Sequence, residues 1–116
     1  MMEIHRSGTT RRWSDTVSWQ GLLFLCEVPS QLDADINGQA TEVLAALAQR
    51  LEEAGSDQRR ILNATIYIPD PADLAAFNAL WDTWVPAGCA PVRACIHAPL
   101  TDPRLRVEIQ MMAALA

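Results

Sequence analysis

The segment from Asp35 to Ala54 constrains the fold most, because its apolar residues follow the period of an α-helix. These residues recur at steps of three and four and form one stripe: Ile36, Ala40, Val43, Leu44, Leu47 and Leu51. Gly55 directly after the segment is a typical helix stop. Such a stripe has to be covered by a second layer, and the segments on either side must supply it.

Those flanking segments alternate apolar and polar residues, which predicts strands. Before the helix, "TVSWQGLLFLCEVP" indicates two strands joined by a tight turn at Gln20–Gly21. After it, "RRILNATIYIPD" predicts a strand with Leu62, Ala64, Ile66 and Ile68 on one face and Ile61, Asn63, Thr65 and Tyr67 on the other. The segments "PVRACIHA" and "LRVEIQMMAA" predict two more strands, the last with Leu105, Val107, Ile109 and Met111 on one face.

A second helix is expected in "DPADLAAFNALWDTWV", where Asp70 can cap the free amides and Pro71 suits the first turn. Its apolar stripe consists of Leu74, Phe77, Leu80, Trp81 and Trp84. The predicted order is β-β-α-β-α-β-β, with a further strand expected near Ile4. One domain over residues 1–116 is expected, an α+β fold with two helices on one face of a mixed sheet of four to six strands.

The other face of this sheet is expected to be only partly polar, because Val17, Trp19, Phe24 and Tyr67 have to lie somewhere on the sheet. Two helices cannot cover both faces of such a sheet. Self-association is therefore expected.

Composition excludes several classes of function. The net charge is −5, the basic residues are all arginines, and they are scattered rather than grouped in a stripe, so nucleic acid is a poor candidate ligand. The longest apolar run, "GLLFLC", is far too short to span a membrane, and the N-terminus lacks a secretory h-region, so a cytoplasmic protein is expected. Cys26, Cys89 and Cys95 form no CxxC pair, which argues against a disulfide framework and a zinc site.

The strand segment "APVRACIHAPL" carries Arg93, Cys95 and His97 on a single face. Arg93, which we expect on a central strand, has two interpretations. It can be a snorkelling or ion-paired structural residue. It can also anchor a carboxylate, because a guanidinium presents paired N–H donors in a fixed fork.

The neighbouring candidates also have two interpretations each. If the last two strands are neighbours, Glu108 lies near Arg93 on the same face, either as a structural ion pair or as a carboxylate that positions water. Cys95 is expected to be a small buried hydrophobe rather than a nucleophile, because His97 two residues later cannot form a tight Cys–His pair with it. Trp13, before the first strand, serves either the core or a pocket wall.

Several separated motifs together resemble the RidA family (reactive intermediate deaminases, also called YjgF). "ILNATIYIPD", "ADLAAFNALWDTWV", "PVRACI" and "RVEIQMMAAL" occur in the family's order, and "RRWSD", "LDAD" and "APVR" are most similar to the YoaB-like branch. The resemblance runs from about Arg12 to Leu115. It implies a chorismate-mutase-like fold and a homotrimer, in which three sheets form a central barrel and ligand clefts lie between subunits.

The resemblance also implies an activity without a metal or organic cofactor. Family members that carry the arginine hydrolyse reactive enamines and imines such as 2-aminoacrylate to 2-oxo acids and ammonia. By resemblance, Arg93 grips the substrate carboxylate, Glu108 places the attacking water, Cys95 lines the pocket and Asn78 lies near it. Trp13 stands in place of a pocket tyrosine.

Two positions depart from the family pattern. Glu27 stands where the family usually has glycine, and Cys26 stands where it has serine or threonine. Both are expected to line the pocket, and a carboxylate at position 27 can narrow it or repel an acidic substrate. One alternative to an imine deaminase is therefore a non-catalytic trimer that binds small carboxylates. A weaker alternative is an endoribonuclease or translation inhibitor, a label that some members of the resembled family carry but that the acidic charge disfavours.

Overall fold

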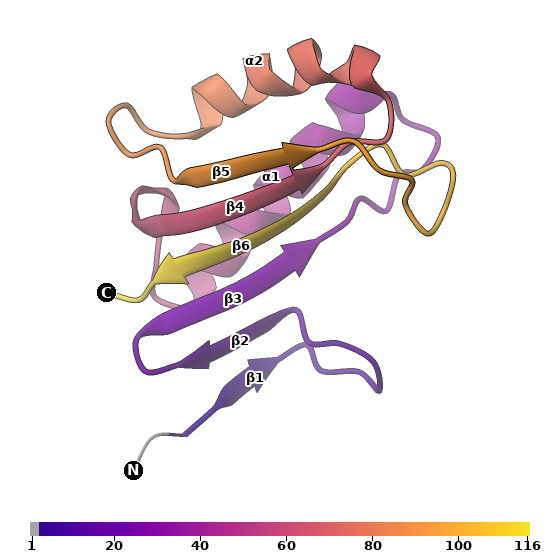
Figure 1. Cartoon of the computed structure of the whole chain (residues 1–116). Helices are drawn as coiled ribbons and strands as arrows, with labels where there is room; N and C mark the ends of the chain where they lie inside the picture. Colours follow the sequence, from indigo (N-terminus) through magenta and orange to yellow (C-terminus); the bar gives the residue numbers. More distant parts are fainter. Residues whose placement is uncertain (1–2) are drawn as a thin grey trace.

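The computed structural model describes residues 3–116, which form one six-stranded mixed sheet with two helices on the same face (Figure 1). The strands are β1 (His5–Ser7), β2 (Thr16–Trp19), β3 (Leu22–Glu27), β4 (Ile61–Tyr67), β5 (Val92–Ile96) and β6 (Glu108–Ala114). The helices are α1 (Ile36–Glu53) and α2 (Leu74–Trp84), and the short 3-10 helices η1 (Gln58–Arg60) and η2 (Pro71–Asp73) precede β4 and α2. The predicted order of elements is confirmed, including the extra strand near Ile4.

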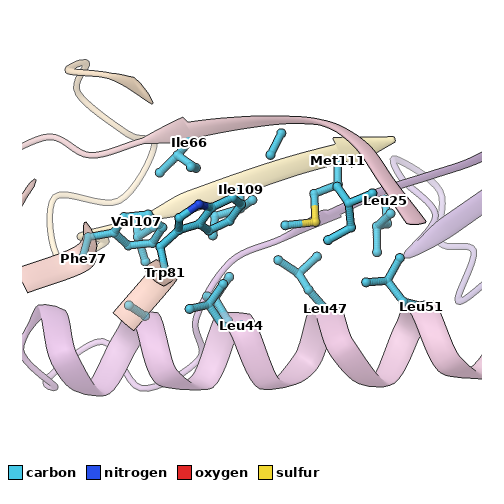
Figure 2. Packing of buried hydrophobic residues seen from close by; sticks show 14 of the residues in the cluster. Leu25, Leu44, Leu47, Leu51, Ile66, Phe77, Trp81, Val107, Ile109 and Met111 are labelled. Atoms are coloured by element: carbon cyan, nitrogen blue, oxygen red, sulfur yellow. The ribbon is translucent and has the colours of Figure 1, made fainter. Parts of the chain in front are cut away.

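Helix α1 lies along the sheet with its apolar stripe buried (Figure 2). Asp35 caps the helix by accepting a 2.9 Å hydrogen bond from the amide of Gly38. Leu44, Leu47 and Leu51 point toward β6, and the indole of Trp81 on α2 closes the same core. The predicted helix-on-sheet packing is therefore confirmed.

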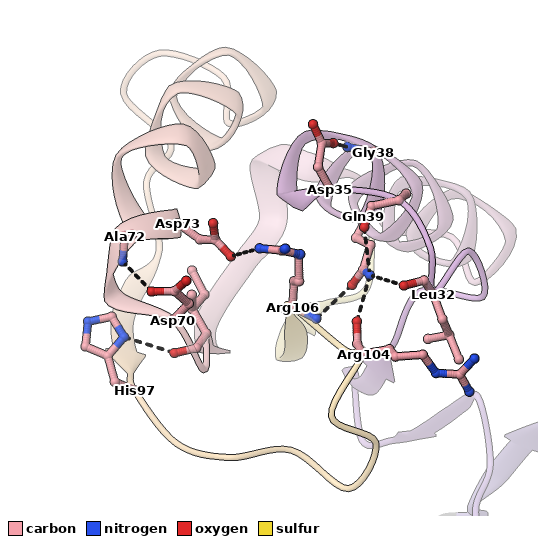
Figure 3. Close-up of polar contacts among 12 residues, drawn as sticks. Leu32, Asp35, Gly38, Gln39, Asp70, Ala72, Asp73, His97, Arg104 and Arg106 are labelled. Atoms are coloured by element: carbon pink, nitrogen blue, oxygen red, sulfur yellow. Dashed lines mark hydrogen bonds and ion pairs between the residues drawn. The ribbon is translucent and has the colours of Figure 1, made fainter.

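The loops at one end of the sheet are tied together by Gln39, a fully buried residue of α1 (Figure 3). Its Nε2 donates to the carbonyls of Leu32, Ala34 and Arg104 at 3.3, 3.2 and 2.9 Å, and its Oε1 accepts from the amide of Arg106 at 2.8 Å. One amide side chain thus satisfies four backbone groups from two loops that are distant in the sequence.

The predicted faces of β4 are wrong at the start of the strand. Ile61 is 5% exposed and belongs to the core, whereas Leu62 is 44% exposed. The register of β4 against β6 shifts between Ile61 and Asn63, so a bulge places one extra residue there and reverses the alternation. From Ala64 onward the predicted faces hold, with Ala64, Ile66 and Ile68 buried.

The predicted central position of Arg93 is also wrong, because β5 is an edge strand. The sheet order is β1-β2-β3-β6-β4-β5, with β4 and β5 parallel and the other neighbours antiparallel. The last strand, β6, occupies the middle of the sheet between β3 and β4 (Figure 1). The last two strands of the sequence are therefore not neighbours. The predicted proximity of Arg93 and Glu108 required them to be adjacent.

The face of the sheet opposite the helices carries exposed apolar side chains. Trp19, Phe24, Val92 and Ile96 are 41, 38, 75 and 41% exposed. They alternate along β2, β3 and β5 with residues on the helix side, so they share the uncovered face. Within residues 3–116, no helix is long and apolar enough to cross a membrane.

Candidate functional site

Arg93 lies on β5 and points toward α2, where two residues hold its guanidinium. Its Nη2 donates a 2.8 Å hydrogen bond to Oδ1 of Asn78. Its Cζ lies 5.5 Å from the centre of the Trp81 ring, within the range of a cation–π contact. Asn78 and Trp81 are three residues apart on α2 and therefore lie on neighbouring positions of one helix surface.

The guanidinium keeps donors for a ligand. None of the ion pairs between residues 3–116 involves Arg93, so the ion-paired interpretation is not supported within the described chain. Asn78 occupies one of five N–H donors, and the remaining donors suit the two oxygens of a carboxylate. We call Arg93, Asn78, Trp81 and Cys95 the arginine cluster.

Cys95 is the fourth member of the arginine cluster and follows Arg93 on the same face of β5. It is half-buried and packs against the hydrophobic core. Burial raises the pKa of its thiol, and the charge of Arg93 opposes that shift only in part. A protonated thiol without a neighbouring base is a poor nucleophile, which agrees with the predicted packing role.

His97 takes no part in either a Cys–His pair or the arginine cluster. Its Nδ1 lies 2.9 Å from the carbonyl oxygen of Ile68 at the end of β4. The ring therefore ties the ends of two neighbouring strands, as expected for a polar residue at a strand end.

The other predicted site residues, apart from Asn78, line a cleft beside the end of β3 and the start of β6. Its volume is about 440 Å³, and Trp13, Ser14, Asp15, Cys26, Glu27, Val28 and Glu108 line it. Trp13 is 62% exposed, so it forms a wall of this cleft and not part of the core. We call Trp13, Cys26, Glu27 and Glu108 the glutamate cluster.

Within the glutamate cluster, Cys26 on β3 forms a hydrogen bond with Glu108 on the neighbouring strand β6. The thiol donates to Oε2 of Glu108 at 3.5 Å. Burial, followed by the charge of Glu108 and this hydrogen bond, raises the pKa of the thiol to about 12. Cys26 is therefore a neutral donor at physiological pH and leaves Glu108 with free lone pairs.

Glu27 is turned toward α1. Its Oε2 lies 3.7 Å from Nε of Arg50. Nη2 of the same guanidinium lies 3.5 Å from Oδ2 of Asp15. Burial raises the pKa of Glu27, while the Arg50 charge opposes the rise. Neither Oε2 of Glu27 nor Nε of Arg50 has a hydrogen-bond partner among residues 3–116, so this contact is electrostatic and loosely fitted.

The two clusters do not meet within one chain. Arg93 pairs with the buried Ala64 and therefore projects from the helix-covered face. Glu108 pairs with Tyr67, three residues along β4, and projects from the uncovered face. The expectation that Glu108 lies beside Arg93 on one face is wrong, because β4 separates their strands and the alternation reverses their directions.

Sequence reasoning missed the contact of Trp81 with Arg93, because the helical stripe assigned Trp81 to the core alone. It is 5% exposed and does pack in the core, but one side of the indole faces the guanidinium. The spacing of three residues between Asn78 and Trp81 could have indicated that both lie on the helix surface that faces Arg93. Across residues 3–116, no group of His, Cys, Asp and Glu side chains could hold a metal ion.

Comparison with known proteins assigns the family. Residues 4–115 match the family model described as Endoribonuclease L-PSP. The chain belongs to this family. Among relatives of the endoribonuclease L-PSP family, the RutC family protein YoaB of Escherichia coli K12 is 44% identical over 114 residues, covering 98% of this chain and 100% of the relative. A RutC family protein of Haemophilus ducreyi is 35% identical and covers 97% of each chain.

Solved structures agree with this assignment. The crystal structure of NMB1025 from Neisseria meningitidis, a member of the YjgF protein family, superimposes with a TM-score of 0.94 at 42% identity, covering 98% of this chain and 96% of that one. The YjgF/RidA family, its YoaB-like branch and the YjgF-like fold, all predicted from the sequence motifs, are thereby confirmed.

Proposed function

We propose that the chain hydrolyses the C=N bond of small imines derived from amino acids. The substrate is a 2-imino acid, or the enamine that tautomerises to it, such as 2-aminoacrylate. Water supplies the oxygen, and the products are a 2-oxo acid and ammonia. The observation that carries this proposal is the arginine cluster, a half-buried guanidinium that is fixed by Asn78 and Trp81 and has donors left for a carboxylate.

The proposed site is shared between two copies of the chain. Arg93 and Glu108 project from opposite faces of the sheet, so a ligand can touch both only where one copy meets another. The exposed apolar side chains of the uncovered face supply a reason for copies to associate. We infer a homotrimer, as the family resemblance implies, with each cleft between the arginine cluster of one copy and the glutamate cluster of the next.

The chemistry needs little beyond orientation and proton transfer. Arg93 holds the carboxylate, which places the electrophilic imine carbon in front of Glu108. The Glu108 carboxylate accepts a proton from water as the oxygen bonds to the carbon of the protonated imine, giving a neutral carbinolamine. Glu108 then passes that proton to the amino nitrogen, the C–N bond breaks and ammonia leaves, and the carbinolamine hydroxyl gives its own proton to the Glu108 carboxylate as the carbonyl forms. The imine supplies the electrophile, so no cofactor is part of the proposal.

The test measures the release of 2-oxo acid from an imine that an amino-acid oxidase generates in situ. Wild type should accelerate the release over the spontaneous rate, and Arg93→Ala should remove the acceleration. Arg59→Ala is the matched control, because Arg59 is exposed and lies outside both clusters. Wild type that accelerates no imine in a panel of several side chains would contradict the proposal.

A second candidate function is the binding of small carboxylates without catalysis. Glu27 favours it, because a third carboxylate beside Asp15 and Glu108 in one cleft is unusual for a site that accepts an acid. Tight binding of a 2-oxo acid, lost in Arg93→Ala, with no acceleration of imine hydrolysis would identify this function. RNA cleavage that persists in Arg93→Ala after repurification would instead indicate the ribonuclease for which the family is named.

A further inference from the structure

The guanidinium of Arg93 is held by neighbours that carry no charge. Asn78 accepts a 2.8 Å hydrogen bond from its Nη2, and the ring centre of Trp81 lies 5.5 Å from its Cζ. Burial raises the pKa of the Cys95 thiol, and the charge of Arg93 opposes this rise only in part, so the thiol is protonated at neutral pH. None of the three neighbours supplies a countercharge.

The acidic residues of α2 do not compensate the charge either. Asp82 follows Asn78 by four residues, but within the described chain it forms no ion pair with Arg93. Asp73, just before α2, is paired with Arg106 at 2.9 Å. Arg93 is thus a half-buried cation without a countercharge in a chain whose net charge is −5. Since an unpaired charge away from bulk water is costly, an anion that neutralises it is bound favourably.

The Asn78 amide has only one possible orientation toward Arg93. An arginine side chain donates hydrogen bonds and accepts none, so the amide has to turn its oxygen to the guanidinium. An aspartate in this place would offer an acceptor of the same shape, but it would also supply a full countercharge. The hydrogen bond would then be kept while the free charge of the anchor would be lost.

Trp81 supports the guanidinium in the same way, without neutralising it. Its indole is 5% exposed and packs beside Phe77 and Trp84, whose ring centres are 6.0 and 5.7 Å away. The face of the ring attracts a guanidinium but carries no net charge. Both residues that hold Arg93 are therefore neutral and are fixed on one helix.

We propose that Asn78 is a specificity-determining residue, which positions Arg93 through a neutral acceptor and thereby reserves the charge of the guanidinium for an anionic ligand. The inference rests on the proposed function only for the identity of that ligand, the carboxylate of a 2-imino acid. The hydrogen bond and the unpaired charge belong to the arginine cluster itself. Replacement of the amide by a carboxylate should therefore abolish selection for anions although it keeps the hydrogen bond.

Pyruvate and its amide form a matched pair of probes, because a carboxylate and a carboxamide have nearly the same shape and differ by one charge. By calorimetry, wild type should bind pyruvate about tenfold more tightly than pyruvamide, a factor typical of one charge-assisted contact. Asn78→Asp should abolish this preference, since the ligand carboxylate would meet a guanidinium that is already paired. Asn78→Ala should weaken binding of pyruvate but keep the preference, because it removes the hydrogen bond and leaves the charge.

Ala79→Asp is the matched control, because it adds the same charge at the next, exposed position of α2 and should leave the preference unchanged. Circular dichroism verifies that each variant is folded. In imine hydrolysis, KM should rise from wild type to Asn78→Ala and further to Asn78→Asp, with a smaller change in kcat, because Arg93 holds the carboxylate before and during the reaction.

A merely structural hydrogen bond predicts the opposite order, because the aspartate variant keeps an acceptor for Arg93. An Asn78→Asp protein that binds pyruvate more tightly than Asn78→Ala would overturn the inference, and so would a wild type that binds both probes equally. Loss of the preference in Asn78→Asp, with no imine hydrolysis by wild type, would reject the deaminase and keep the inference. Imine hydrolysis by wild type that is undiminished in Asn78→Asp would reject the inference and keep the deaminase.

Discussion

At the residue scale, the guanidinium of Arg93 is held by two different kinds of contact. Asn78 fixes the plane of the fork through a hydrogen bond, and Trp81 supports the charge from its ring face. A lysine in this place would keep the charge but would lose the paired donors and the stacking surface.

Arg93→Lys should therefore lower kcat/KM for imine hydrolysis about 100-fold, mainly because one point charge orients a carboxylate poorly. The measurement is the initial rate of 2-oxo acid release over a range of substrate concentrations. Arg59→Lys, at an exposed position, should behave as wild type. A lysine variant that retains full activity would show that charge alone suffices and that the fork has no role.

Alternation along the sequence predicted that Arg93 and Cys95 share one face, and both indeed lie on the helix side. It could not predict which face, because Val92, Ala94 and Ile96 form an equally apolar set on the other side. On an edge strand both faces of β5 are partly exposed, so hydrophobicity does not distinguish them. The direction of Arg93 depends on α2, which covers that edge.

At the element scale, local patterns predicted both helices and most of the strands, since hydrophobic period and capping residues are local properties. The strand order was not predictable in the same way. β6 pairs with β3 and β4, which are far away in the sequence, and this choice separates Arg93 from Glu108. The bulge at the start of β4 is equally non-local, because it depends on the register against β6.

Gln39 shows how one side chain on α1 holds two loops. Gln39→Leu should lower the free energy of unfolding by about 2–4 kcal/mol, because it leaves buried backbone groups of both loops without partners. Denaturant unfolding measures this change. Gln49→Leu, on the exposed side of the same helix, should change stability by less than about 0.5 kcal/mol. A Gln39→Leu protein as stable as wild type would mean that water replaces the lost hydrogen bonds.

Glu42 on α1 holds the start of the loop after β3. It accepts hydrogen bonds from the hydroxyl and amide of Ser30, both at 2.7 Å, and from the amide of Gln31 at 3.1 Å. Burial alone would raise the pKa of Glu42, but these bonds outweigh it and lower the pKa below its usual value. The folded state thus binds this proton more weakly than the unfolded state, so the stabilisation is present above the ordinary glutamate pKa and is lost as pH falls through the lowered one.

Glu42→Gln should consequently destabilise the protein by about 1 kcal/mol at pH 7, and the difference from wild type should shrink as the pH falls below about 4. Denaturant unfolding of both proteins between pH 3 and pH 7 tests this. A difference that stays constant over the whole range would contradict a role for the ionised carboxylate.

At the scale of the whole molecule, the uncovered face of the sheet connects the fold to the proposed site. A face that carries Trp19, Phe24 and Ile96 is costly to leave in water, and association of copies would cover it. The same association would bring together clusters that one chain keeps on opposite faces. Oligomerisation and activity should therefore be lost together.

Phe24→Glu, which places a charge on the uncovered face, should convert the oligomer to monomers and abolish imine hydrolysis without unfolding the chain. Light scattering coupled to size-exclusion chromatography measures the mass, and circular dichroism checks the fold. Ala45→Glu on the exposed side of α1 is the control that should preserve both mass and activity. Full activity in a monomeric Phe24→Glu protein would contradict a shared site.

Complementation between two inactive variants tests the central claim most directly. Arg93→Ala and Glu108→Gln should each abolish imine hydrolysis on their own. When the two are co-expressed in equal amounts and assemble at random, each mixed trimer has one site of three that combines an intact arginine cluster with an intact glutamate cluster, which is about a quarter of the sites in the whole population once the two homotrimers are included. The co-expressed population should then recover about a quarter of the wild-type rate of 2-oxo acid release, and the isolated mixed trimers about a third. Verified mixed oligomers that remain as inactive as the separate variants would contradict a site built from two copies.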